Sequence, residues 1–172
     1  MVHQHIYDSL IATPVSVEDA IAGDIVWGAF RGWISGFLML IVSLALGVFP
    51  FSWFHAGILL VFMAFIGILF ASFAMIVTSF APNFDFFSYY TELCITPMIF
   101  FSSVFFPLDK FPGWLKTCSL FLPLTHAVNI SRSLFSGQAS SMHVGISFIV
   151  LAMACLVAFF SGLALMKRRL VK

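Results

Sequence analysis

The chain has 172 residues, of which 62% are hydrophobic and only 9% are charged, and its formal net charge is +1. Soluble domains average about 45–50% apolar and about 25% charged residues, so this composition excludes an ordinary soluble protein. The near-neutral charge gives no support to nucleic-acid binding. We expect an all-α, polytopic membrane protein, and at about 20 residues per span the chain has room for about four transmembrane helices.

A cytoplasmic segment, residues 1–31, is expected before the first span. Thr13 and Pro14 suit the N-cap and the first position of a helix. Glu18 and Asp19 suit the positive end of the helix dipole, and apolar residues then recur on one face at helical spacing. Two interpretations remain open: an interfacial helix that leads the chain into the bilayer, or a helix presented to a cytoplasmic partner.

Four apolar stretches follow this segment. From Gly32 to Phe84 there is no Asp, Glu, Lys or Arg, and Pro50 divides this stretch into two spans. Membrane β-strands are excluded because they need alternating polarity, whereas ILLVFMAFIGILF is apolar throughout. The expected spans are residues 33–48, 54–80, 87–105 and 144–166, with an outer re-entrant loop over residues 106–142.

Basic residues predict the orientation. The densest basic cluster directly follows the last span, and Arg31 directly precedes the first span. With an even number of spans both groups lie on one face, which the positive-inside bias assigns to the cytoplasm. We therefore expect a multi-pass membrane protein with both termini in the cytoplasm. The cluster is Lys167, Arg168, Arg169 and Lys172, whereas Lys110, Lys116 and Arg132 in the outer loop run against the bias.

The third predicted span contains two unusual residues, Glu92 and Pro97. A carboxylate deep in a bilayer is costly and usually faces a cavity, whereas near the interface the cost is small. Both positions remain open for Glu92. Pro97 removes a backbone hydrogen bond, so a kink or a break is expected there.

The loop after this span is too apolar for a solvated connection and is divided by prolines. We expect two short helices that dip back into the outer leaflet, over about residues 113–121 and 124–135, and a purely structural hairpin cap is the alternative. Small residues at helical spacing also predict close helix packing. They are Gly32-xxx-Gly36, Ser43-xxx-Gly47, Gly67-xxx-Ala71 and Ala154-xxx-Ala158-xxx-Gly162.

Several motifs of enzyme chemistry are missing from the sequence. No GxxxxGK[ST] phosphate-binding loop, HExxH zinc motif or GxSxG elbow occurs. The three cysteines, Cys94, Cys118 and Cys155, are scattered without a metal or disulfide spacing. We therefore expect no catalytic residue, no metal site and no cofactor on this chain.

Two stretches carry a resemblance to a known family. FFSSVFFPLDKFPGWLK followed by LPLTHAVNISRSLFSG resembles the C-terminal signature of type-2 ABC exporter permeases, which export lipo-oligosaccharides, polysaccharides or drugs. The upstream YDSLIATPVSVEDAIAGDIVWGAFRG is similar to the cytoplasmic loop before the family's third span. The resemblance covers essentially the whole chain and matches the third to sixth of the family's six spans.

This resemblance implies a permease of the bacterial inner membrane that works with a separate ABC ATPase subunit and a second permease copy, among membrane lipids. A coupling helix would dock on the ATPase, with contacts from Tyr7, Thr13, Pro14, Glu18, Asp19 and Asp24. The re-entrant helices near the exit would hold Phe106, Pro107, Phe111, Pro112, Leu122, Pro123, Thr125 and His126. Glu92, Pro97 and Arg132 are added to the predicted translocation path on the basis of their own chemistry.

Three other interpretations remain open at this stage. The chain could be a non-transporting membrane scaffold whose outer loop binds a partner, or a partial and inactive permease copy. It could also be a membrane-embedded transferase, whose general base would be Glu92, Asp109 or His126.

Overall fold

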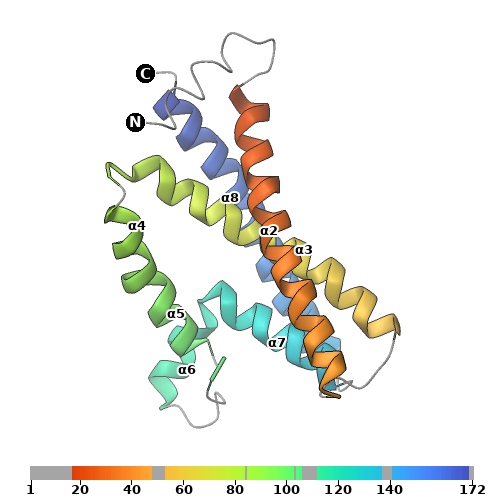
Figure 1. Cartoon of the computed structure of the whole chain (residues 1–172). Coiled ribbons are helices and arrows are strands. Elements are labelled where there is room, and N and C mark those ends of the chain that lie inside the picture. Colours follow the sequence, from red (N-terminus) through yellow and green to blue (C-terminus); the bar gives the residue numbers. More distant parts are fainter. Residues whose placement is uncertain are drawn as a thin grey trace.

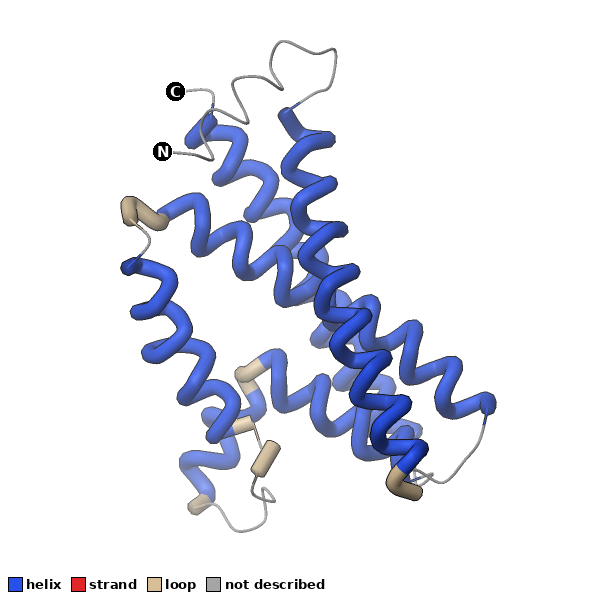
Figure 2. Tube along the Cα trace, in the orientation of Figure 1, coloured by secondary structure: helices blue, strands red, loops and turns tan. Residues whose placement is uncertain are grey.

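The computed structural model describes residues 17–47, 53–83, 85–102, 104–105, 112–136 and 141–170. Within these ranges every regular element is a helix and none is a strand, as the tube in Figure 2 shows. The all-α prediction is therefore confirmed.

Three long helices form the body of the molecule (Figure 1): α2 (Val17–Ala45), α3 (Trp53–Phe80) and α8 (Ser141–Leu170). Each contains a stretch long and apolar enough to cross a membrane, as a polytopic membrane protein requires. The three stretches are Val17–Ala45, Phe54–Phe80 and Val144–Arg169.

Helix α2 is longer than the predicted first span. It passes through Gly32 without interruption, so the end of the predicted 1–31 segment and the predicted span over 33–48 form one helix. Helix α2 contains no proline, and a single glycine such as Gly32 costs a helix only about 1 kcal/mol. Gly47, with φ of +67°, lies just past its end and adopts the left-handed conformation that commonly terminates helices.

Helix α3 lies between α2 and α8 and packs extensively against both. Two groups of buried side chains hold this arrangement together. At one end, Ile21 and Ile25 of α2 meet Met75 of α3 and Met166 of α8. Further along, the second group joins α3 and α8 to a shorter helix, α7 (Pro123–Ser136). Its members are Phe62, Leu69, Ala127, Ile130, Leu151 and Cys155.

Small residues allow the long helices to approach closely, as predicted for three of the four motifs, including Gly36, where a Cβ would lie 2.9 Å from Sδ of Met63 on α3. A Cβ on Gly67 would lie 2.9 Å from the carbonyl oxygen of Ala29, so α3 and α2 are in backbone contact there. A Cβ on Gly162 would lie 3.3 Å from the carbonyl oxygen of Ser72, so α8 also lies close to α3, with slightly more space. The prediction is wrong for Gly32 and Gly47, where a Cβ would meet nothing within 4 Å.

The third predicted span is a helical arm that stands apart from the other helices in Figure 1. It consists of α4 (Asp85–Tyr90), a π-helical turn (Thr91–Ile95) and α5 (Thr96–Phe101), and no residue of these elements is buried. The arm packs mainly through its ends, with α4 against α3 and α5 against α7. With the three long helices it would bring the number of spans to four, although each of its helices is shorter than they are.

The elements divide between two ends of the bundle. Helix α2 begins, α3 ends, α4 begins and α8 ends at one end, drawn uppermost in Figure 1. The opposite end holds α6 (Gly113–Leu120), α7 and the first turns of α3 and α8. We call these the α2-start end and the α6 end. The two short helices predicted over 113–121 and 124–135 are confirmed as α6 and α7.

Candidate coupling and translocation elements

Charged side chains form an ion pair and hydrogen bonds between three helices at the α2-start end. Lys167 of α8 forms an ion pair with Glu18 in the first turn of α2. Arg169 of α8 donates hydrogen bonds to the carbonyl oxygens of Thr78 and Ala81, at 2.8 Å for Ala81. These are carbonyls at the end of α3, where a helix lacks internal donors and where positive charge is favourable. The start of α2 and the ends of α3 and α8 are therefore tied to one another.

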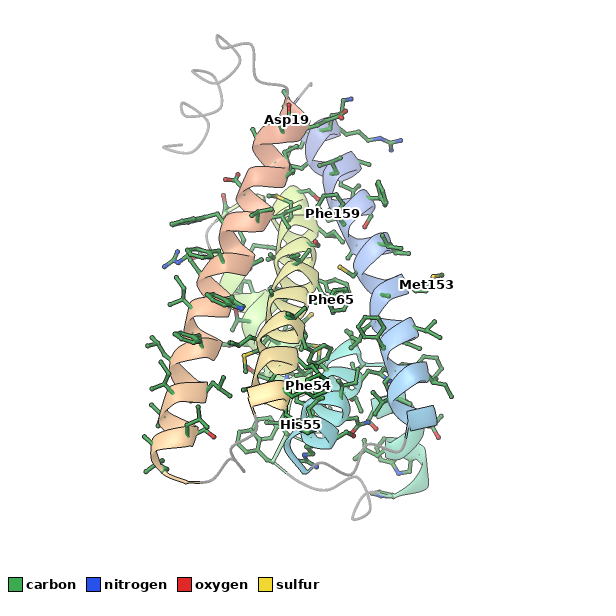
Figure 3. The ribbon with its side chains drawn as sticks, turned by 90° about the vertical axis from the view of Figure 1, so that its right-hand side faces the viewer. Asp19, Phe54, His55, Phe65, Met153 and Phe159 are labelled. Atoms are coloured by element: carbon green, nitrogen blue, oxygen red, sulfur yellow. The ribbon has the colours of Figure 1, made fainter. Side chains whose placement is uncertain are left out.

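The predicted coupling residues are placed in part. Glu18, Asp19 and Asp24 lie on the first two turns of α2 and are exposed, and Figure 3 shows Asp19 at the start of the helix. Ile21 and Ile25 in the same part of the helix are fully buried. Glu18 lies on the side of α2 that faces α8 and is paired with Lys167, whereas Asp19 lies on another side of the helix. Tyr7, Thr13 and Pro14 lie outside the described residues.

Glu92 and Pro97 lie at the interruption in the helical arm. Glu92 is exposed within the π-helical turn, and Pro97 follows in the first turn of α5. The Thr96 backbone N–H and hydroxyl both bond to the carbonyl of Thr91, five residues earlier, the hydroxyl at 3.1 Å. A π-turn displaces the bonding pattern by one residue just before the proline, which itself has no N–H to donate. The interruption predicted at Pro97 is therefore a π-helical turn just before the proline.

Prolines begin both short helices at the α6 end. Pro112 caps α6, and Pro123 is the first residue of α7, a position where its missing N–H and fixed φ are no disadvantage. Leu122 lies between the two helices, and its N–H bonds to the carbonyl of Ser119 at 3.1 Å. Phe106, Pro107, Phe111 and Asp109 lie outside the described residues.

His126 connects α6, α7 and α8. Its Nε2 lies 2.9 Å from the carbonyl oxygen of Leu120, and its Nδ1 lies 3.1 Å from Oγ of Ser147. A carbonyl can only accept, so Nε2 donates to Leu120, and Nδ1 forms the second bond with the Ser147 hydroxyl. His126 is only 8% exposed and its neighbour Thr125 is completely buried. Both are internal packing residues of the α6 end, and both ring nitrogens of His126 are occupied by protein groups.

Arg132 lies further along α7 and bonds outside its own helix. One of its guanidinium N–H groups donates to the carbonyl oxygen of Val104, just beyond α5, at 3.4 Å. Arg132 therefore links α7 to the end of the helical arm. It also lines a pocket of about 420 Å³ between α7 and α8, together with His126, Asn129, Ser133 and Ser147. We call this the polar pocket.

A second and larger hollow adjoins it. This apolar groove has a volume of about 1030 Å³ and runs between the first half of α3, the end of α7 and the start of α8. The rings of Phe65 on α3 and Phe148 on α8 stack there with centroids 5.6 Å apart. Its lining also includes Phe54, Ile58, Phe62 and Ile130.

The structure brings some predicted site residues together and separates others. Thr125, His126 and Arg132 share α7, whereas Glu92 lies on the helical arm and the acidic residues of α2 lie at the opposite end. Ser147, Asn129 and the apolar groove were not predicted from the sequence. A histidine on the apolar face of an amphipathic helix was the available signal, because a buried imidazole needs hydrogen-bond partners.

The described residues also bear on the enzymatic interpretation. Among them, no three His, Cys, Asp or Glu side chains form a group that could hold a metal ion. Of the three bases considered for a transferase, His126 has both nitrogens bonded inside the protein and Glu92 is exposed on another element.

These features define a helical, polytopic membrane protein. Its long helices are linked by polar contacts at one end, and a pair of short helices, α6 and α7, directly precedes α8. Residues 1–136 match the ABC-2 type transporter family, and the chain belongs to that family.

Curated relatives agree with this membership. Nodulation protein J of Rhizobium meliloti (strain 1021) is 33% identical over 168 residues, which covers 98% of this chain and 63% of the relative. Nodulation protein J of Rhizobium leguminosarum bv. viciae is 33% identical over 98% of this chain and 64% of its own length. The daunorubicin resistance ABC transporter permease protein DrrB1 of Streptomyces coeruleorubidus is 26% identical, over 95% of this chain and 58% of its own length.

The chain therefore spans a little under two thirds of the length of the curated relatives that it matches. No solved structure matches it.

Proposed function

We propose that the chain is a permease subunit of an ATP-binding-cassette exporter. It moves an amphipathic or lipid-linked substrate outward across the inner membrane, while a separate subunit hydrolyses ATP. Family membership supports transport, and the name of the DrrB1 relative supports a permease role. The coupling proposal rests on the ion pair between Glu18 and Lys167. This ion pair connects the acidic start of α2 to α8, the helix that extends to the α6 end.

The proposed mechanism is mechanical. An ATPase that closes on ATP displaces the start of α2, whose exposed acidic residues form the contact. The backbone contact between Gly67 and Ala29 transmits this displacement to α3, because no compressible side chain separates the two helices there. Buried side chains shared by α3, α7 and α8 carry it to the α6 end, where α6 and α7 form the gate.

The helical arm is the proposed contact with a second permease copy or with the part of the permease that the longer relatives have in addition. Its elements have no buried residue, and large apolar side chains such as Tyr89 and Leu93 are 62% and 72% exposed. Two permease copies and two ATPase copies would complete the exporter.

We expect the α6 end to face the outside of the cell and the α2-start end to face the cytoplasm. Native Cys118 is exposed on α6, so a membrane-impermeant maleimide added to intact cells is expected to label it. Cys155 is buried and stays unlabelled, and a Cys118→Ser variant serves as the control. Labelling that appears only after the cells are opened would reverse the orientation.

ATP-dependent transport tests the function itself. The chain is co-expressed with candidate ABC ATPases from the same genome, and the purified complex is reconstituted into vesicles with a fluorescent lipid-linked oligosaccharide. Transport should require ATP and should stop when the ATPase active site is inactivated. Changing both Glu18 and Asp19 to Lys is expected to abolish transport but leave membrane insertion intact, because both residues are exposed in the first turn of α2.

The double variant Glu18→Lys with Lys167→Glu distinguishes loss of the intrachain ion pair from loss of the ATPase contact. This pair of changes restores the ion pair but leaves a reversed charge on the exposed face of α2. Transport that no substitution at Glu18 or Asp19 reduces would contradict the coupling role. A chain that never co-purifies with an ATPase would instead favour the scaffold interpretation.

A further inference from the structure

The apolar groove and the polar pocket are neighbours, and we call the two together the hollow. Both are lined by Ile130 of α7 and Val144 of α8, so they meet at these two residues. Their volumes, about 1030 Å³ and about 420 Å³, lie in or just above the range of about 300–1,000 Å³ that is typical of ligand sites.

The chemistry of the two halves differs sharply. The described residues that line the groove are all hydrophobic or glycine. Those that line the pocket include Asn129, Ser133 and Ser147 and also Arg132, which donates one of its N–H groups to the carbonyl of Val104. A guanidinium group carries five N–H donors in a planar arrangement that suits phosphate oxygens. One end of the hollow therefore suits hydrocarbon, and the other suits a polar anion.

The dimensions of the groove correspond to one membrane leaflet. It follows α3 from Phe54, near the start of the helix, to Phe65, about halfway along it (Figure 3). At 1.5 Å per residue this is roughly 16 Å, about half of the 30 Å hydrocarbon core of a bilayer. Phe54 and Val61 are 74% and 73% exposed, so the groove is open along one side.

We propose that this hollow binds one membrane glycerophospholipid with an anionic headgroup. The phosphate binds Arg132 in the polar pocket, and an acyl chain lies along the apolar groove against Phe62 and Phe65. The polar lining of the pocket, with its guanidinium group, favours a lipid headgroup over a purely apolar occupant such as another helix, which would leave this lining unmatched. The lipid would fill the space between α3, α7 and α8 and so support the position of α7. This inference does not depend on the export function.

Lipid retention tests the proposal on the whole chain. The protein is reconstituted into nanodiscs of equal phosphatidylglycerol and phosphatidylethanolamine, re-extracted with a mild detergent and washed. The lipid that remains is then identified and counted by mass spectrometry. The wild-type chain is expected to retain one phosphatidylglycerol, and Arg132→Gln to lower its preference over phosphatidylethanolamine by about tenfold, as loss of one charge-assisted contact implies.

Glycines allow the groove to be filled without a clash. Gly57 and Gly145 line it, and a Cβ on either would meet nothing within 4 Å. The double variant Gly57→Leu with Gly145→Leu is expected to lose the retained lipid and keep its folding. Gly32→Leu is the matched control, because a Cβ there also meets nothing within 4 Å and Gly32 on α2 does not line the groove.

Three results would overturn the proposal. The first is equal retention of both lipids by the wild type and Arg132→Gln. The second is unchanged retention by the filled variant, which would place the lipid elsewhere. The third is recovery of the exported substrate, or of a dimer disrupted by filling the groove, in place of a phospholipid. Transport assays stay separate, because the filled variant can lose its lipid whether or not the chain exports anything.

Discussion

Replacing Gly67 with leucine is expected to prevent stable assembly of the helices. A Cβ at this position would lie 2.9 Å from the carbonyl oxygen and 3.2 Å from the Cα of Ala29, and both of these are backbone atoms that cannot rotate away. Overpacking usually costs about 1–3 kcal/mol, and helix association in lipid depends mainly on close packing. The thermal unfolding midpoint in detergent and the yield of monodisperse protein are therefore both expected to fall sharply.

The matched control is Gly57→Leu on the same helix, where the added side chain meets nothing within 4 Å and stability is expected to be retained. A smaller side chain should have a graded effect, so Gly67→Ala is expected to lie between the wild type and Gly67→Leu. Equal unfolding midpoints for Gly67→Leu and Gly57→Leu would show that α2 and α3 are not in backbone contact. The proposed transmission from α2 to α3 would then lose its basis.

Replacing His126 with leucine is expected to destabilise the protein by about 1–3 kcal/mol, the typical cost of leaving buried polar partners without a hydrogen bond. The change removes the bonds from the imidazole to the Leu120 carbonyl and to the Ser147 hydroxyl. Helix α6 would then separate more readily from α8. Equilibrium unfolding in detergent measures the stability, and transport in vesicles measures the effect on the gate.

A double-mutant cycle with Ser147→Ala isolates the contact between the two side chains. If they are bonded as the structure has them, the double variant is less destabilised than the sum of the two single variants. Strict additivity would contradict the bond. The enzymatic interpretation, in which His126 acts as a general base, makes a different prediction. In that case the purified protein would show transferase activity on a lipid-linked sugar without ATP, and His126→Leu would lose this activity but keep full stability.

Much of the helical architecture was predictable because its determinants are local. A stretch without charged residues from Gly32 to Phe84 requires membrane helices, and the proline at 123 locates the start of α7. Backbone hydrogen bonding within a helix depends on nearby residues, so patterns of a few residues predict it. The small residues at 67 and 71 also predicted close packing, since only small side chains permit such an approach in lipid.

Other features depended on which helices become neighbours. The sequence places Glu18 and Lys167 almost at opposite ends of the chain, and only the packing of α2 and α8 around α3 brings them together. Small-residue spacing likewise could not distinguish Gly67, which contacts α2, from Gly47, which ends a helix. Both outcomes are set by the partner surface, which short-range patterns do not contain.

The sequence alone determined the class of protein, the approximate helices and the residues that interrupt them, because hydrophobic burial and backbone hydrogen bonding act on neighbouring positions. Tertiary structure alone decided that His126 binds Ser147 across 21 residues and that a leaflet-length groove meets a pocket lined by Arg132. Such contacts arise when packed helices bring separate parts of the chain into register. Their geometry follows from the whole arrangement of α3, α7 and α8 and from no single segment.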